Sequence, residues 1–164
     1  MENSEERGRQ ASIDGFTHEH IVVGLLMKKY RNISLVDLPL SPYDIIIALK
    51  DKGEEEEIIR CQVKTARTSI SFTGGTRGGV DREYKSDVKT YIQSTKTSDI
   101  VIGIHPIDEN TYDLYFLPTI IIEQLDQKSI AISKVERLKN NYEILERCKD
   151  KKFIISKAKE CNIL

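Results

Sequence analysis

Four polar side chains occupy positions where the neighbouring residues are apolar, and together their types suit phosphodiester hydrolysis. Asp44 begins the apolar run DIIIAL, and Gln62 and Lys64 lie in a second run, EIIRCQVKTA. Glu19 lies in DGFTHEHIVVGLLMKKY, on the helical stripe that its apolar neighbours would bury. Hydrolysis of a phosphodiester needs a hard divalent cation that stabilises the pentacoordinate charge and lowers the pKa of the attacking water. It also benefits from a fixed positive charge near the nucleophile or the phosphate.

Oxygen donors are available for such a cation. The side chains of Asp44 and Gln62 and the backbone carbonyl of Val63 could hold Mg²⁺, with Mn²⁺ as a substitute. Lys64 would then orient or deprotonate water.

Two strands must bring these residues together. Residues 44–49 are apolar on both faces apart from Asp44, which predicts a central strand, and DKGEEEE predicts an exposed turn. On the returning strand, period-two geometry places Gln62 and Lys64 on the face opposite its apolar residues. We therefore expect a hairpin that gives Asp44, Gln62 and Lys64 a common edge.

The other elements predict an α/β fold with a mixed sheet. We expect a helix over 14–30 with Asp14 as its N-cap, a short strand over 69–72 and a helix over 84–96. Two strands joined by a turn at 108–110 follow, the second running through TYDLYFLPTIII, and His105 in the first is expected to be structural.

One domain is expected over residues 13–164, after a disordered lead over residues 1–12, because 164 residues with 39 % hydrophobic content can fill one core. Residues 128–164 predict a basic amphipathic helical extension that would grip phosphates, pair two subunits or close the core. No apolar run approaches the length of a membrane span, so no membrane partner is expected. Three cysteines without a CxxC spacing argue against zinc and indicate a reduced, cytoplasmic protein.

Positive charge is concentrated, although the formal net charge is −1. Residues 58–89 contain seven basic and three acidic residues, and residues 128–159 contain ten basic and four acidic ones. Such local potential favours a nucleic-acid partner. For DNA contact we expect Arg67, Arg82 and Arg77, which lies in the glycine-rich segment TGGTRGG, with Thr65 and Lys85 as lesser candidates.

The motif PYD, followed after an acidic turn by QVK, resembles the PD-(D/E)XK nuclease signature. Pro42 and Asp44 are one position further apart than in the strict form, and Gln62 replaces the Asp/Glu. Gly15 and Glu19 on a helix, then a proline-rich strand, YDII and QVKTAR resemble one branch of this superfamily over residues 13–122. That branch contains group I intron homing endonucleases, archaeal Holliday junction resolvases and some restriction endonucleases.

The resemblance implies a restriction-endonuclease-like core, with a central mixed β-sheet flanked by helices. It also implies that Asp44 is the metal-binding aspartate, Lys64 the catalytic lysine, Gln62 the second metal ligand and Glu19 an added helix carboxylate. A neutral amide brings one oxygen and no charge, so metal affinity should fall unless Glu19 restores the missing carboxylate.

We therefore expect a Mg²⁺-dependent endodeoxyribonuclease that cuts duplex DNA as restriction enzymes do. A homodimer is expected because cutting both strands requires two antiparallel sites. A Holliday junction resolvase or a homing endonuclease would use the same active site. In a different class, a non-catalytic nucleic-acid-binding module on a decayed nuclease fold would keep DNA affinity and lose the metal, with Gln62 marking that loss.

Overall fold

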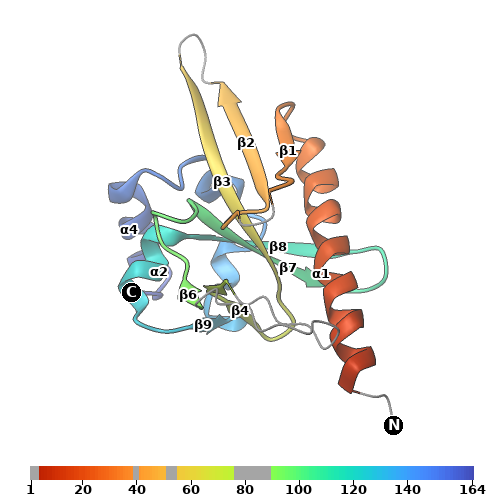
Figure 1. Cartoon of the computed structure of the whole chain (residues 1–164). Helices are drawn as coiled ribbons and strands as arrows, with labels where there is room; N and C mark the ends of the chain where they lie inside the picture. The colour runs from red at the N-terminus through yellow and green to blue at the C-terminus, as the bar shows by residue number, and fades with distance from the viewer. Residues whose placement is uncertain (1–3, 39–40, 51–54, 76–89) are drawn as a thin grey trace.

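A mixed sheet of five strands forms the centre of the fold, in the order β1, β2, β3, β7, β8, and helices flank it (Figure 1). The strands are Ile33–Leu35, Ile45–Lys50, Glu56–Thr65, Ile100–Pro106 and Tyr112–Pro118. β3 and β7 run parallel and the other neighbours are antiparallel. This computed structural model describes residues 4–38, 41–50, 55–75 and 90–164. The fold class predicted from the sequence is confirmed.

The β2–β3 hairpin forms as predicted. Ile45 pairs with Cys61 and Ile47 with Ile59, and all four side chains are fully buried. β7 is buried from Ile100 to Ile104, as expected for a strand in the middle of a sheet that is covered on both faces. The apolar residues of these strands therefore fix the register of the hairpin.

Helix α1 spans Ser4–Met27 and packs on β1 and β3 through the fully buried Val22 and Leu26. It begins well before Asp14, which is inside the helix and accepts a hydrogen bond from Gln10 Nε2 at 2.8 Å. The prediction of an N-cap at Asp14 is therefore wrong, and so is the prediction of a disordered lead for residues 4–12. Residues 5–12 are exposed and, apart from Gly8 and Ala11, polar, so they carry no apolar stripe that would reveal a helix.

The predicted helix over 84–96 is wrong where the structure describes it, because residues 91–92 form strand β6 (Tyr91–Ile92), which pairs with β5 (Thr73–Gly74). The backbone N–H of Gln93 extends this pairing by donating to the Phe72 carbonyl at 2.8 Å. Residues 84–89 lie outside the described residues. The second predicted strand of the later hairpin is also shorter than expected, since β8 ends at Pro118 and helix α2 (Thr119–Leu125) follows.

The C-terminal region is a chain of short elements instead of the single predicted helix. They are β9 (Ser129–Ala131), two 3₁₀ turns (Ile132–Lys134 and Glu136–Leu138), α3 (Tyr142–Glu146) and α4 (Lys151–Glu160). β9 pairs with β4 (Ser69–Ser71). Val135, Leu138 and Leu145 are at most 1 % exposed, so the region closes the core and is not an appended extension. Figure 1 shows α2 and α4 on one side of the molecule and α1 on the other.

One close approach in the sheet requires glycine. A side chain at Gly103 of β7 would lie 2.9 Å from two carbon atoms of the fully buried Ile70. Gly103 pairs with Lys64 of β3, so this contact lies beside Lys64 in the sheet. Among the described residues, no helix is both long enough and apolar enough to cross a membrane.

Candidate active site

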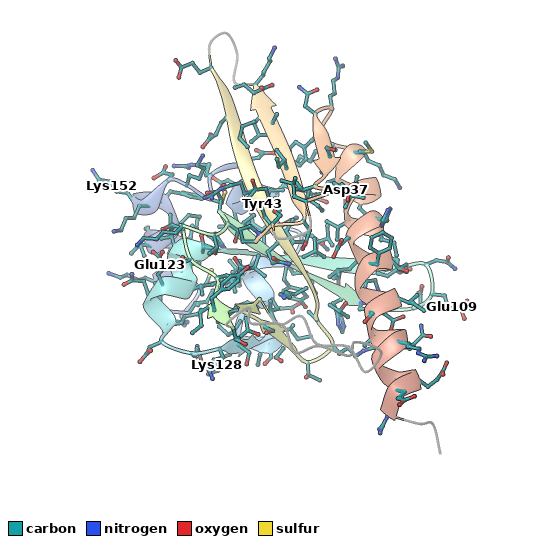
Figure 2. All side chains as sticks on the ribbon, in the orientation of Figure 1. Asp37, Tyr43, Glu109, Glu123, Lys128 and Lys152 are labelled. Atoms are coloured by element: carbon teal, nitrogen blue, oxygen red, sulfur yellow. The ribbon has the colours of Figure 1, made fainter. Side chains whose placement is uncertain are left out.

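Asp44 lies where the hairpin opens, one residue before β2. Its backbone N–H donates to the Cys61 carbonyl at 2.9 Å, which holds it beside β3. Its carboxylate turns toward β3, and Oδ2 accepts hydrogen bonds from the Val63 backbone N–H at 2.7 Å and from Gln62 Nε2 at 2.5 Å. Tyr43, the preceding residue, marks this end of the hairpin in Figure 2. Two donors on one oxygen therefore fix the orientation of the Asp44 carboxylate.

The Val63 carbonyl opens toward the same place. In a strand, the N–H and C=O of one residue point to the same side, and the Val63 N–H points to Asp44. The carbonyl lies 3.3 Å from Gln62 Nε2. Asp44 and the Val63 carbonyl thus present oxygen atoms to one location.

The predicted alternation of buried and more exposed side chains along β3 is confirmed. Cys61 and Val63 are buried, and Gln62 and Lys64 are half-buried on the other face. Arg60 shares that face, but its guanidinium is engaged elsewhere: it donates to both carboxylate oxygens of the buried Asp99, at 2.8 and 3.1 Å. Arg60 is therefore a structural residue, and the polar set near Asp44 is Gln62 and Lys64.

The Gln62 amide is hydrogen-bonded to Gln93 at the end that faces away from Asp44. Gln93 Nε2 donates to Gln62 Oε1 at 3.2 Å, and Gln93 is 1 % exposed. The nitrogen of the Gln62 amide faces Asp44, and the oxygen expected to bind a cation faces Gln93. The contact of Gln93 with the site could not be predicted from the sequence, because nothing in the polar run QSTKTS distinguishes a buried glutamine from a surface one.

Glu19 reaches the site from α1. Burial and the nearby Asp44 raise its pKa from 4.5 to about 7, while His20 and Lys64 act in the opposite direction. Burial likewise raises the pKa of Asp44, against the hydrogen bond from Val63 and the charge of Lys64. Within the described part of the chain, the structure therefore brings the Glu19 and Asp44 carboxyl groups together beside Lys64.

Burial lowers the pKa of Lys64, and the charges of Asp44 and Glu19 oppose that effect. Glu19, Asp44 and Lys64 are thus within electrostatic reach of one another, although they come from a helix and from two strands. An ammonium with a lowered pKa gives up its proton more readily than an exposed lysine does.

His18 fixes α1 against β3 at this level. Its Nδ1 lies 2.7 Å from Thr65 Oγ1, and the ring is only 8 % exposed. Burial lowers the pKa of His18, which favours the neutral ring. Because His18 precedes Glu19 and Thr65 follows Lys64, this contact sets the position of Glu19 relative to the lysine.

The donor set suits a hard divalent cation. Among the described residues, no group of three or more His, Cys, Asp or Glu side chains could hold a metal. The set near Asp44 is instead the carboxylates of Asp44 and Glu19 with the Val63 carbonyl, all oxygen donors of the kind that Mg²⁺ and Mn²⁺ prefer. By their chemistry these three groups suit such an ion, and the Gln62 oxygen is turned away from them toward Gln93.

The residues predicted to contact DNA are only partly described. Arg67 is exposed, and its guanidinium forms an ion pair with Asp14, with 3.7 Å between Nη2 and Oδ2. Arg67 and Thr65 also line a pocket of about 410 Å³. The Thr65 hydroxyl is already bound to His18. Arg77, Arg82 and Lys85 lie outside the described residues. His105, predicted to be structural, has its Nδ1 2.7 Å from the Ala66 carbonyl.

No protein-family model matches the chain, and no curated protein matches it. Among solved structures, that of a bacterial homing endonuclease, I-Ssp6803I, is similar, with a TM-score of 0.44 and 13 % sequence identity. The match covers 79 % of this chain and 78 % of the other.

Proposed function

We propose that the protein is a Mg²⁺-dependent endodeoxyribonuclease that cuts duplex DNA as restriction enzymes do. The observation that carries the proposal is the convergence of Asp44, Lys64 and Glu19 where the β2–β3 hairpin opens. Two half-buried carboxyl groups beside one lysine are unfavourable for stability alone, because their charges repel and burial disfavours both. A bound divalent cation would relieve that cost.

Mg²⁺, or Mn²⁺ in its place, would be held by Asp44, Glu19 and the Val63 carbonyl. When bound, such an ion polarises a phosphoryl oxygen and lowers the pKa of a water molecule. Glu19 would supply the negative charge that Gln62 does not provide. The hydrogen bond from Val63 keeps Asp44 pointed at the site, so little reorganisation is needed when DNA arrives.

Lys64 would act on the water or on the phosphate. Its lowered pKa favours transfer of a proton, and in its ammonium form it offsets the charge of the phosphodiester. Because Lys64 is partly buried, water screens its charge less, which strengthens its interaction with the water molecule or with the phosphate.

DNA would approach along the exposed Arg67, with Arg77, Arg82 and Lys85 as further proposed phosphate contacts and Thr65 beside them. The described residues form one such site, and cutting both strands requires two, so we propose that a homodimer cuts both strands. Each phosphate contact contributes to affinity in a salt-dependent way and does not read sequence.

The test is a cleavage assay on plasmid, linear duplex, four-way junction and single-stranded DNA with Mg²⁺, run beside calorimetric titration of Mg²⁺ and Mn²⁺. We expect metal binding and cutting of duplex DNA. Preference for the junction would indicate a resolvase, and cutting at one long site would indicate a homing endonuclease. DNA affinity without metal binding or cleavage would contradict the proposal and favour a non-catalytic nucleic-acid-binding module.

A further inference from the structure

Gln93 is a buried amide whose side chain makes four hydrogen bonds, one of them to Gln62 of the candidate site. Its Nε2 donates to the Pro42 carbonyl and to Gln62 Oε1, both at 3.2 Å. Its Oε1 accepts from the hydroxyls of Thr97 at 2.6 Å and Ser98 at 2.8 Å. An apolar residue of the same size would leave Gln62 Oε1 and the buried Ser98 hydroxyl without these hydrogen bonds.

The orientation of the Gln93 amide is determined by its partners. A backbone carbonyl can only accept, so the Gln93 atom that faces Pro42 must be the nitrogen. The oxygen then faces Thr97 and Ser98, whose hydroxyls can donate. Because the same nitrogen also faces Gln62, the Gln62 atom on that side must be an acceptor, which is Oε1.

The other end of Gln62 leads to the same assignment independently. There the amide lies against the Asp44 carboxylate and the Val63 carbonyl. An ionised carboxylate and a carbonyl accept and do not donate, so the Gln62 atom between them must be the nitrogen. Acceptors at the Asp44 end and a donor at the Gln93 end therefore select one orientation of Gln62.

We propose that Gln93 is a positioning residue that holds the Gln62 amide with its nitrogen toward Asp44, so that Gln62 serves the site as a hydrogen-bond donor and not as an oxygen ligand of the cation. The hydrogen-bond arrangement does not depend on the proposed nuclease function, although its consequence for the cation does. Turning Gln62 over would place its two donors against the Gln93 donor and its oxygen against Asp44, which disfavours the ligand orientation.

Replacement of Gln93 by glutamate should reverse this arrangement. A carboxylate at position 93 accepts where the wild-type amide donates, so with a cation held at Asp44 Gln62 would turn its nitrogen toward residue 93 and its oxygen toward the cation. Gln93→Met removes the donor without adding charge and leaves Gln62 unrestrained. Gln124→Met, an exposed glutamine on α2, is the matched control.

The first experiment is NMR on ¹⁵N-labelled, metal-free protein, with the Gln62 side-chain signal identified by its loss in Gln62→Met. We expect solvent exchange of the Gln62 amide protons to be at least about tenfold faster in Gln93→Met than in the wild type, and unchanged in Gln124→Met. Equal exchange in the wild type and Gln93→Met would overturn the positioning role, whether or not the protein cuts DNA.

The second experiment is crystallography with Mn²⁺ soaked into the wild type and Gln93→Glu. We expect the Gln62 side chain to stay on Asp44 in the wild type and to reach the ion, at about 2.2 Å, only in Gln93→Glu. A Gln62 oxygen bound to the ion in the wild type would overturn the inference. If no ion binds Asp44 at all, the proposed function fails, and the NMR result decides the positioning role alone.

Discussion

Replacing Glu19 with glutamine should stabilise the metal-free protein while weakening its site. The pKa of Glu19 is raised from 4.5 to about 7, chiefly by burial and also by Asp44. At about 1.4 kcal/mol for each pKa unit, that difference corresponds to about 3.5 kcal/mol. Glu19 is only half-buried and solvent screens part of the effect, so we reduce the expectation to about 1.5 kcal/mol.

The direction in which stability changes with pH follows from proton binding to Glu19. Below pH 4.5 Glu19 is protonated in both the folded and the unfolded chain, and its carboxyl group costs the fold nothing. Between pH 4.5 and about 7 the unfolded chain loses the proton first, so stability falls as the pH rises. Above about pH 7 the loss is complete, and Glu19→Gln should then gain its full advantage.

The assay is urea unfolding in EDTA at pH 5 and at pH 8. We expect the free energy of unfolding of Glu19→Gln to exceed that of the wild type by about 1.5 kcal/mol at pH 8 and by less than about 0.5 kcal/mol at pH 5. Glu109→Gln is the control, because Glu109 is exposed on the β7–β8 turn, far from Tyr43 in Figure 2. Adding Mg²⁺ should stabilise the wild type more than Glu19→Gln. A variant no more stable than the wild type at pH 8 would show that the ionised Glu19 carboxylate does not destabilise the metal-free fold.

Three further changes test the site and the fold beneath it. Gln62→Glu replaces the donor to Asp44 with a carboxylate, so we expect the free energy of unfolding of the metal-free protein to fall by about 1–3 kcal/mol at pH 8. The added carboxylate should also tighten Mg²⁺ binding in calorimetry. Weaker Mg²⁺ binding would count against the site. Asp99→Asn breaks the pair with Arg60 and should cost about 2–4 kcal/mol in urea unfolding, with Mg²⁺ affinity preserved; lost affinity would show that this pair supports the metal. Gly103→Ala forces a methyl group against a buried side chain and should cost about 1–3 kcal/mol; a stable variant would show that β7 can yield there.

The hairpin was predictable because its information is local. The apolar runs of β2 and β3 and the acidic turn between them set both the strands and their faces, so Asp44, Gln62 and Lys64 could be placed before the structure was known. Glu19 was predictable for a related reason, because a carboxylate on an apolar helical stripe indicates a special environment.

The errors arose where distant contacts override local pattern. The helical spacing of Val135, Leu138 and Leu145 is real, and all three are buried. Asn140, between them, takes a positive φ of 51° and donates its backbone N–H to the Leu114 carbonyl, which breaks the helix. Gln93 was not predictable, because its role depends on Gln62, 31 residues away in the chain.

The most direct test of the account is Mg²⁺-dependent plasmid cleavage by the wild type, Asp44→Asn, Lys64→Ala and Lys152→Ala. Lys152 is exposed on α4, at the opposite edge of Figure 2 from Glu109, and serves as the matched lysine control. We predict that the wild type and Lys152→Ala cut equally, and that Asp44→Asn and Lys64→Ala cut at least about 100-fold more slowly while remaining folded. Equal cutting by all four proteins, or no cutting by a folded, Mg²⁺-supplied wild type, would contradict the assignment of this site.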